Sequence, residues 1–132
     1  MATKYEHRHI SMQKKLGAVK KLTLNADPLH MKILFSNILD NAYQAIAAGA
    51  GSVTLSASRA EEMVAIEITD TGTGISQKDM KRIFEPFFTK KSHGTGLGLT
   101  ICKQIVELHG GKLSVNSTMG EGTSVSVVLP LK

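Results

Sequence analysis

The chain has 132 residues, of which 42% are hydrophobic, and this length suits one domain with a single core. Its one cysteine, Cys102, excludes an intrachain disulfide and a zinc site made of four cysteines. The net charge is +5, but only 5% of the residues are aromatic and none is Trp, which argues against a base-stacking surface for nucleic acid. The apolar runs are too short for a transmembrane helix and the polar N-terminus does not resemble a signal peptide, so we expect a cytoplasmic location.

The first 25 residues have the weakest pattern, with short strands predicted at 10–12 and 19–24. A helix is predicted next, because Asp27 is a typical N-cap residue and Pro28 suits the first helical position. An apolar period close to 3.6 residues then runs to Ala48, and two glycines shortly afterwards end it.

The rest of the chain mixes strand and helix patterns. Adjacent strand pairs separated by helices favour an α+β fold, with helices layered on one sheet, over a fully parallel βαβ array. In chain order, the predicted elements are a strand hairpin at 53–57 and 64–68, a short helix from Ser76 to about Ile83 opened by a capping box of Ser76 and Asp79, an irregular segment over 84–96, a helix from about Leu97 to His109, and strands at 113–115 and 125–129.

Two asparagines on the first predicted helix, Asn37 and Asn41, are four residues apart and therefore share a face. Asn is a poor helix former, because its amide competes for backbone hydrogen bonds, so the pair is unexpected in mid-helix. The pair indicates either a solvated stripe or a functional site. An amide oxygen is a hard neutral ligand that suits Mg²⁺, whose remaining ligands can come from phosphates.

Asp70 falls on the same alternating face as Ile66 and Ile68, so its carboxylate is predicted to point toward the core at the end of a strand. Burial of a carboxylate is costly unless it is hydrogen-bonded. The residues after it, 71–75, include two glycines. The pattern fits either an aspartate that caps a glycine turn or an acceptor for a ligand donor such as the amino group of adenine, with the glycines letting the ligand lie against the backbone.

A second glycine-rich run opens the last predicted helix. Glycines together with the free amides of a helix N-terminus favour an anion, and Lys90 and Lys91 just upstream add positive charge. The run is not a P-loop, because no Gly-Lys-Ser/Thr follows it, and a flexible loop remains the alternative. Its residues are Gly94, Thr95, Gly96, Leu97, Gly98 and Leu99.

Taken together and in this order, these segments resemble the nucleotide-binding domain of the GHKL superfamily, and specifically the catalytic ATP-binding domain of sensor histidine kinases of the nitrogen-regulator-like subgroup. The resemblance covers about residues 25–132, within a single domain over 1–132. The matching segments are 37–42 for the N box, 70–75 for the first glycine box, 83–88 for the phenylalanine box, 94–99 for the second glycine box, and 120–123.

The resemblance implies the Bergerat fold, a two-layer α/β sandwich with a mixed sheet, and ATP with Mg²⁺ as ligands. Asn41 would be the Mg²⁺ ligand and Asn37 would lie beside the phosphates, which makes these two the catalytic pair. Asp70 would accept from the amino group of adenine, and residues 84–96 would form a mobile lid. The other residues implied to bind the nucleotide are Gly72, Gly74, Ile75, Lys91, Gly94, Thr95, Gly96, Leu97, Gly98, Leu99 and Thr123.

Three positions depart from the family pattern. Ile33 stands where the family often has Gln, Glu or His, which removes a candidate acid or base and argues against a hydrolysing ATPase of the topoisomerase or mismatch-repair type. Gln44 replaces a frequent Lys and Ala45 a frequent aromatic residue. A kinase that phosphorylates a protein serine, and a nucleotide-binding module without transferase activity, remain as further alternatives.

The phosphoacceptor of the resembled family is a His followed by an acidic residue on a dimeric helical hairpin. None of the five histidines of this sequence is followed by Asp or Glu. We therefore expect a monomeric catalytic domain that phosphorylates a histidine on a separate dimeric acceptor domain of a parent protein, which a membrane could anchor. A response regulator receiver domain would act downstream.

Overall fold

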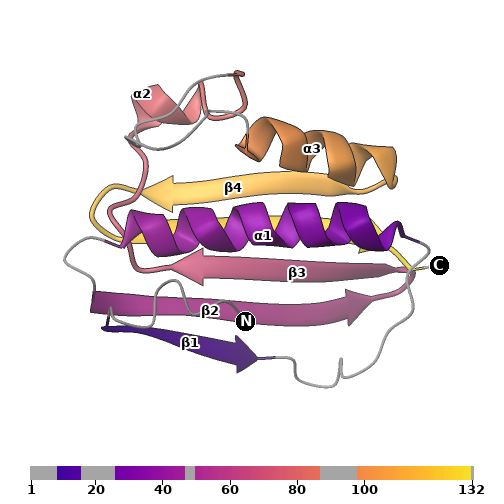
Figure 1. The fold of residues 1–132 in the computed structure, drawn as a ribbon, viewed down its shortest axis with the longest axis horizontal. Helices are drawn as coiled ribbons and strands as arrows, with labels where there is room; N and C mark the ends of the chain where they lie inside the picture. Colours follow the sequence, from indigo (N-terminus) through magenta and orange to yellow (C-terminus); the bar gives the residue numbers. More distant parts are fainter. Residues whose placement is uncertain (1–8, 16–25, 47–49, 87–97, 132) are drawn as a thin grey trace.

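The computed structural model describes residues 26–46, 50–86 and 98–131 and the backbone of residues 9–15. A five-stranded sheet in the order β1-β2-β3-β5-β4 carries two long helices on one face (Figure 1). The strand β1 pairs with β2 in parallel and the other neighbours pair antiparallel, which confirms the α+β sandwich with a mixed sheet. The strands are β1 (His9–Lys15), β2 (Ala50–Ala60), β3 (Met63–Asp70), β4 (Lys112–Thr118) and β5 (Gly122–Pro130).

The strand predictions are confirmed wherever the structure describes the chain. The predicted strand at 10–12 lies inside β1, and the predicted hairpin is β2 joined to β3 by a tight turn at Glu61, whose φ is 56°. The predicted strands at 113–115 and 125–129 are parts of β4 and β5. The predicted strand at 19–24 lies outside the described residues.

The first long helix, α1 (Pro28–Ala45), begins at the predicted cap. The Asp27 carboxylate accepts hydrogen bonds from the amides of Leu29 at 2.8 Å and His30 at 3.3 Å. The predicted end at Ala48 is wrong by three residues, because the backbone of Ile46 is already extended while its side chain is buried. The carbonyl of Ala45 accepts from the amide of Thr73 at 3.0 Å, a partner from the loop after β3.

The two remaining helices begin near the predicted residues, but α2 ends at Met80, three residues before the predicted end at Ile83. The single turn α2 (Gln77–Met80) is capped by Ser76, whose hydroxyl accepts from the amide of Asp79 at 3.1 Å. The helix α3 (Gly98–Leu108) ends just before His109, and Gly110 then adopts a φ of 78°. Leu97, the predicted start of α3, lies outside the described residues.

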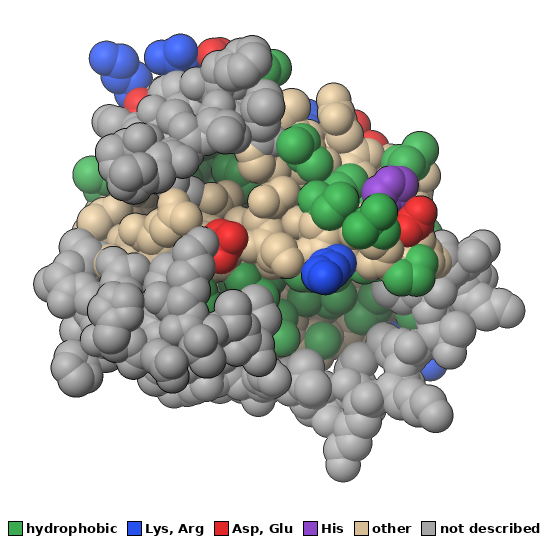
Figure 2. Space-filling model, viewed as in Figure 1, with side chains coloured by type: hydrophobic (Ala, Val, Ile, Leu, Met, Phe, Trp, Pro, Cys, Tyr) green, Lys and Arg blue, Asp and Glu red, His purple; other side chains and the backbone are tan. Residues whose placement is uncertain are grey.

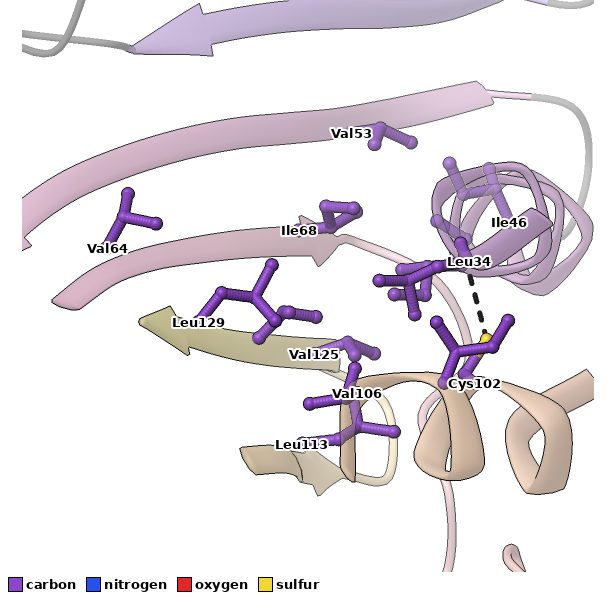
Figure 3. Close-up of a cluster of buried hydrophobic side chains, with 14 residues drawn as sticks. Leu34, Ile46, Val53, Val64, Ile68, Cys102, Val106, Leu113, Val125 and Leu129 are labelled. Atoms are coloured by element: carbon purple, nitrogen blue, oxygen red, sulfur yellow. Dashed lines mark hydrogen bonds between the residues drawn. The ribbon is translucent and has the colours of Figure 1, made fainter. Parts of the chain in front are cut away.

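The core lies between the sheet and the two long helices (Figure 3). Each of α1 and α3 turns one apolar stripe toward the inward side chains of β2, β3, β4 and β5. Burial of these side chains is the main favourable contribution to folding. The core residues are Leu34, Ile38, Ala42, Ile46, Val53, Val64, Ile68, Cys102, Ile105, Val106, Leu113, Val125, Val127 and Leu129.

At one end of the sandwich, the start of α1 meets the end of α3. The amide of Asp27 donates to Nε2 of His109 at 3.2 Å, so the proton of this imidazole is on Nδ1, 2.8 Å from the Ile105 carbonyl. Hydrophobic side chains gather on the surface at this end (Figure 2), where Leu29 is 63% and Leu108 is 70% exposed. Among the described helices, none has the length and apolar character needed to cross a membrane.

Candidate functional site

The opposite end of the sandwich, where β3 ends, holds the predicted acidic residue. The side chain of Asp70 is directed into the core and is 5% exposed, as the alternation predicts. Its Oδ1 accepts a hydrogen bond from the amide of Gly72 at 2.8 Å, which offsets part of the cost of burying a carboxylate.

Asp70 belongs to a row of four residues, one from each of four neighbouring strands, which we call the cross-sheet row. Val53 of β2 pairs with Asp70, Asp70 pairs with Thr123 of β5, and Thr123 pairs with Ser117 of β4. Directly opposite residues have Cβ atoms about 4.5–5.5 Å apart, so the row places the Thr123 hydroxyl next to the Asp70 carboxylate and the Ser117 hydroxyl next to Thr123. Asp70 and Thr123 are the only buried polar residues of the described core.

The loop after β3 is packed tightly against the end of α1. A Cβ atom on Gly72 would lie 2.4 Å from the backbone oxygen of Ala45, a distance that no side chain permits. The neighbouring amide of Thr73 donates to that same oxygen. Glycine at position 72 is therefore required for the turn to reach the helix, and the turn in turn orients Asp70.

The same loop is also fixed to the β4–β5 hairpin. Gly74 has a φ of 79°, and a Cβ atom there would lie 2.2 Å from the carbonyl oxygen of Thr118. The amide of Gly120 donates to the carbonyl of Thr73 at 2.9 Å, and the amide of Ile75 donates to the hydroxyl of Ser117 at 2.7 Å. The backbone of 72–75 is thus held on both sides, close to Asp70 and Thr123.

The two asparagines of α1 face the first residue of α3. A Cβ atom on Gly98 would lie 3.9 Å from Nδ2 of Asn41 and 4.0 Å from Cγ of Asn37, which is ordinary contact distance. Leu99 follows in the first turn of α3. The N-terminus of a helix carries partial positive charge and free amides, so these residues together offer hydrogen-bonding groups suited to an anion.

Cys102 packs behind this asparagine pair. Its thiol donates to the carbonyl of Leu34 across the interface between α1 and α3, at 3.6 Å. Burial raises the pKa of the thiol to about 11, while a side-chain hydrogen bond with Asn37 acts in the opposite direction. The thiol therefore stays protonated at neutral pH.

Phe84, four residues after the end of α2, is attached to α3. The hydroxyl of Thr100 donates to the carbonyl of Phe84 at 2.9 Å, and Nζ of Lys103 lies 5.0 Å from the centre of the Phe84 ring. This contact places residues 84 and 100 side by side. Residues 87–97 themselves lie outside the described part.

The structure brings the predicted site residues into two adjoining groups. One group contains Asp70, Gly72, Gly74, Ile75 and Thr123 at the end of β3 and β5, and the end of α1 connects it with Asn37, Asn41, Gly98 and Leu99. Five predicted residues are outside the described ranges, namely Lys91, Gly94, Thr95, Gly96 and Leu97.

Sequence reasoning missed Ser117, which contacts both the loop after β3 and Thr123. The signal available in the sequence was its place on the alternating face of Leu113 and Val115, two residues before the turn at 119–122. Alternation gives only the face of the sheet on which Ser117 lies. It does not identify the hydrogen-bond partners of the side chain, so it could not identify a role.

The donor set fits a nucleotide better than a metal bound by the protein alone. The cross-sheet row supplies the buried carboxylate of Asp70 and the hydroxyl of Thr123. The contact between α1 and α3 supplies the side-chain amides of Asn37 and Asn41 and a helix N-terminus at Gly98. Over the described ranges, no three His, Cys, Asp or Glu side chains gather closely enough to hold a metal ion. A Mg²⁺ ion would therefore need phosphate oxygens in addition to Asn41, as Mg²⁺ commonly does.

Residues 26–132 match the family model described as "Histidine kinase-, DNA gyrase B-, and HSP90-like ATPase". Sporulation kinase C of Bacillus subtilis is 37% identical over 124 residues, which cover 94% of this chain and 29% of that kinase. The chain thus spans less than a third of this curated relative.

Two solved structures have the same fold. The mycobacterial sensor histidine kinase MprB superposes with a TM-score of 0.78 at 30% identity, over 93% of this chain and 83% of that one. Full-length ShkA in complex with AMPPNP superposes with a TM-score of 0.82 at 27% identity, over 96% of this chain and 27% of that one.

Proposed function

Because the chain belongs to the family of histidine kinase-, DNA gyrase B- and HSP90-like ATPases, as an ATP-binding domain of the sensor histidine kinase type, we propose that it binds Mg-ATP and transfers the γ-phosphoryl group to a histidine of a separate protein domain. The proposed catalytic unit is one domain over residues 1–132, and the acceptor is a dimeric helical domain of a longer parent protein.

The observation that carries the nucleotide part is the buried carboxylate of Asp70. A carboxylate that is 5% exposed lies at the open end of a strand, next to backbone that only glycines could form. We assign it to the amino group of adenine, with Gly72, Gly74 and Ile75 along the base. Thr123, opposite Asp70 in the sheet, is assigned to the same base.

The phosphates are assigned to the other group of residues. Asn41 supplies an amide oxygen for Mg²⁺, Asn37 lies one turn before it on the same helix, and Gly98 in the first turn of α3 lies close to both. Leu99, the next residue of that turn, is assigned to the phosphates with it. Lys91 and the run Gly94, Thr95, Gly96 and Leu97 complete this assignment from outside the described residues. Mg²⁺, when bound, would neutralise charge on the phosphate oxygens.

Phosphoryl transfer depends mainly on positioning and charge stabilisation, so the chain needs no nucleophile of its own. The nucleophile in this proposal is the imidazole of the acceptor domain. A response regulator receiver domain would then take the phosphoryl group from that histidine. Both partners belong to the proposal.

Titration calorimetry with ATP and ADP, with and without Mg²⁺, tests the binding step. Asn41→Ala should lower the contribution of Mg²⁺ to affinity or to transfer, whereas Gln44→Ala, on an exposed position of the same helix, should not. An unchanged response to limiting Mg²⁺ in Asn41→Ala would remove the metal from this residue.

Radiolabelled ATP tests the transfer step. We expect the purified chain to bind ATP without becoming labelled, and acid-labile phosphate to appear on the dimeric acceptor domain of the parent once that domain is added. Label on the chain alone that is lost in His93→Ala would make this histidine an acceptor and overturn the assignment. ATP binding with no transfer to the acceptor domain would favour a nucleotide-binding module.

A further inference from the structure

Ser117 contacts three groups from two other segments through a single hydroxyl. The amide of Ile75, in the loop after β3, donates to its Oγ at 2.7 Å. On β5, the carbonyl of Gly122 lies 3.0 Å from the same oxygen and the hydroxyl of Thr123 lies 2.8 Å from it. No other described serine has hydrogen bonds to both the loop after β3 and β5.

Counting protons determines the direction of these hydrogen bonds. A serine hydroxyl has one proton to donate and two lone pairs that accept. The Ile75 amide can only donate, so it uses one lone pair of Ser117, and the Gly122 carbonyl can only accept, so it takes the proton. All three contacts are satisfied together only when Thr123 donates its own proton to Ser117.

Thr123 then presents only lone pairs to the rest of the site. It stands directly opposite Asp70 in the sheet, and both side chains are buried. An ionised carboxylate is also an acceptor only. Both neighbouring polar groups of the row therefore offer lone pairs toward a ligand, and these pair with N–H or O–H donors.

We propose that Ser117 is a positioning residue that fixes Thr123 as an acceptor beside Asp70, so that the site selects a base with an amino group over one with an acceptor oxygen at the same position. This inference rests on the proposed nucleotide function and identifies a source of its base selectivity. The hydrogen bond from the Ile75 amide to the same hydroxyl, which we call the Ile75 tether, holds the loop after β3 close to Asp70 and Thr123.

Adenine and 6-methoxypurine are the suitable probes, because they differ in having an amino group or an acceptor oxygen at one ring position and both leave the neighbouring N1 without a proton. With the Ser117 hydroxyl present, the methoxy oxygen of 6-methoxypurine riboside triphosphate faces two acceptors. Without it, the Thr123 hydroxyl is free to rotate and donate to that oxygen. Loss of the Ser117 hydroxyl should therefore reduce the preference for ATP over the 6-methoxy analogue.

Calorimetric titration of the full chain with ATP and the 6-methoxy analogue measures this preference. Ser117→Val and Ser117→Thr have the same shape and differ in the hydroxyl, so their comparison isolates the hydrogen bonds. We expect the affinity ratio of ATP to the analogue to fall about tenfold in Ser117→Val, the effect of one mispaired polar group, and to keep its wild-type value in Ser117→Thr. Ser114→Val, on the exposed face of β4, is the matched control that should change nothing.

A second readout needs no nucleotide. Amide hydrogen exchange at Ile75 in the ligand-free chain should be faster in Ser117→Val than in Ser117→Thr, because only the threonine retains the acceptor. Equal exchange in the two variants overturns the Ile75 tether.

The remaining outcomes separate this inference from the proposed function. Wild-type binding of ATP with an undiminished ratio in Ser117→Val overturns the inference alone, and so does an equal loss of both nucleotides. A wild-type chain that binds neither nucleotide overturns the proposed function as well. If Ser117→Val does not fold, Thr123→Val against Thr123→Ser decides instead, and an unchanged ratio in Thr123→Val overturns the acceptor role.

Discussion

Single residues in this chain owe their orientation to neighbours far away in the sequence. Asp70 is buried as a carboxylate because the Gly72 amide donates to it, and Gly72 can lie there only because it has no Cβ atom to collide with Ala45. A hydrogen bond to a charged group contributes about 1.5–3 kcal/mol, which offsets part of the desolvation. The environment of Asp70 thus depends on the end of a helix 25 residues earlier in the chain.

Asp70→Asn is expected to weaken adenine nucleotide binding strongly, because the amide presents N–H donors where the proposed site needs an acceptor. A mispaired buried group costs about 1–3 kcal/mol, or roughly tenfold to a hundredfold in affinity. Titration calorimetry with ATP measures the loss. Glu67→Gln makes the same chemical change on an exposed position of the same strand and should bind normally. Wild-type affinity in Asp70→Asn would disprove the adenine assignment.

The same substitution at two glycines of the site should affect two different properties, the stability of the fold in one case and ATP binding in the other. Gly72→Ala places a Cβ atom against the Ala45 carbonyl and should destabilise the fold by about 1–3 kcal/mol, as overpacking does. Gly98→Ala has room for its Cβ atom but puts it beside Asn37 and Asn41, so it should fold normally and bind ATP more weakly. Thermal unfolding and calorimetry on both variants separate the effects, and a stable Gly72→Ala protein would contradict the packing argument.

At the scale of the elements, each long helix is fixed at an end by a polar contact with another part of the fold. Asp27 caps α1 through its carboxylate, and its own amide donates to His109 at the end of α3. Hydrogen bonds from the amides of His30 and Leu29 lower the pKa of the Asp27 carboxyl below its ordinary value of 3.8. The stability that this cap gives to α1 therefore depends on pH in the acidic range.

Because the folded pKa of Asp27 is depressed, its contribution to stability is present above pH 3.8 and is lost as the pH falls through the folded pKa. Asp27→Ser keeps a capping oxygen without a titrating group, whereas Asp27→Ala removes both. We expect the unfolding free energy of wild type to fall more steeply than that of Asp27→Ser below pH 4, and Asp27→Ala to be less stable at neutral pH. Denaturant unfolding at several pH values measures this, and parallel pH profiles for wild type and Asp27→Ser would exclude a role for the carboxyl.

Local patterns predicted the elements well because helix and strand periods depend on neighbouring residues. The inward direction of Asp70 and the cap at Asp27 are such local properties, and both are confirmed. The parallel pairing of β1 with β2 is not local, since it joins residues 9–15 to 50–56 across α1. The end of α1 was missed because Ile46 continues the apolar period although its backbone is extended, and Ser117 was missed because its partners come from other segments.

At the scale of the whole molecule, the sandwich has two different ends joined by one core. The polar row and the asparagine pair lie at one end, and the contact of Asp27 with His109 lies at the other. The helix α1 runs between these ends and the shorter α3 runs from the asparagine pair to His109 (Figure 1), with Cys102 of α3 buried between the two helices. Opening the interface between α1 and α3 would therefore disturb both ends together.

Cys102 should act as a reporter of that opening. A thiol that is fully buried, with its pKa raised to about 11, reacts with iodoacetamide only when the helices separate. Saturating ATP should slow labelling of the wild-type chain at pH 8, because ligand binding stabilises the closed state by mass action. In a Cys102→Ser, Gln104→Cys variant the thiol is exposed, so labelling should be fast with or without ATP. Rapid labelling of native wild type would show that the interface is not closed.

The cross-sheet row has a consequence for the order of assembly during folding. Its members arrive on four strands, and a shift of one residue in any pairing would turn that strand's contribution to the opposite face of the sheet. A chain misregistered in this way would therefore lose the site together with the burial of that strand's apolar side chains. The ligand would bind only chains whose strands have the native register. Excess ligand would therefore increase the fraction of chains in that register by mass action.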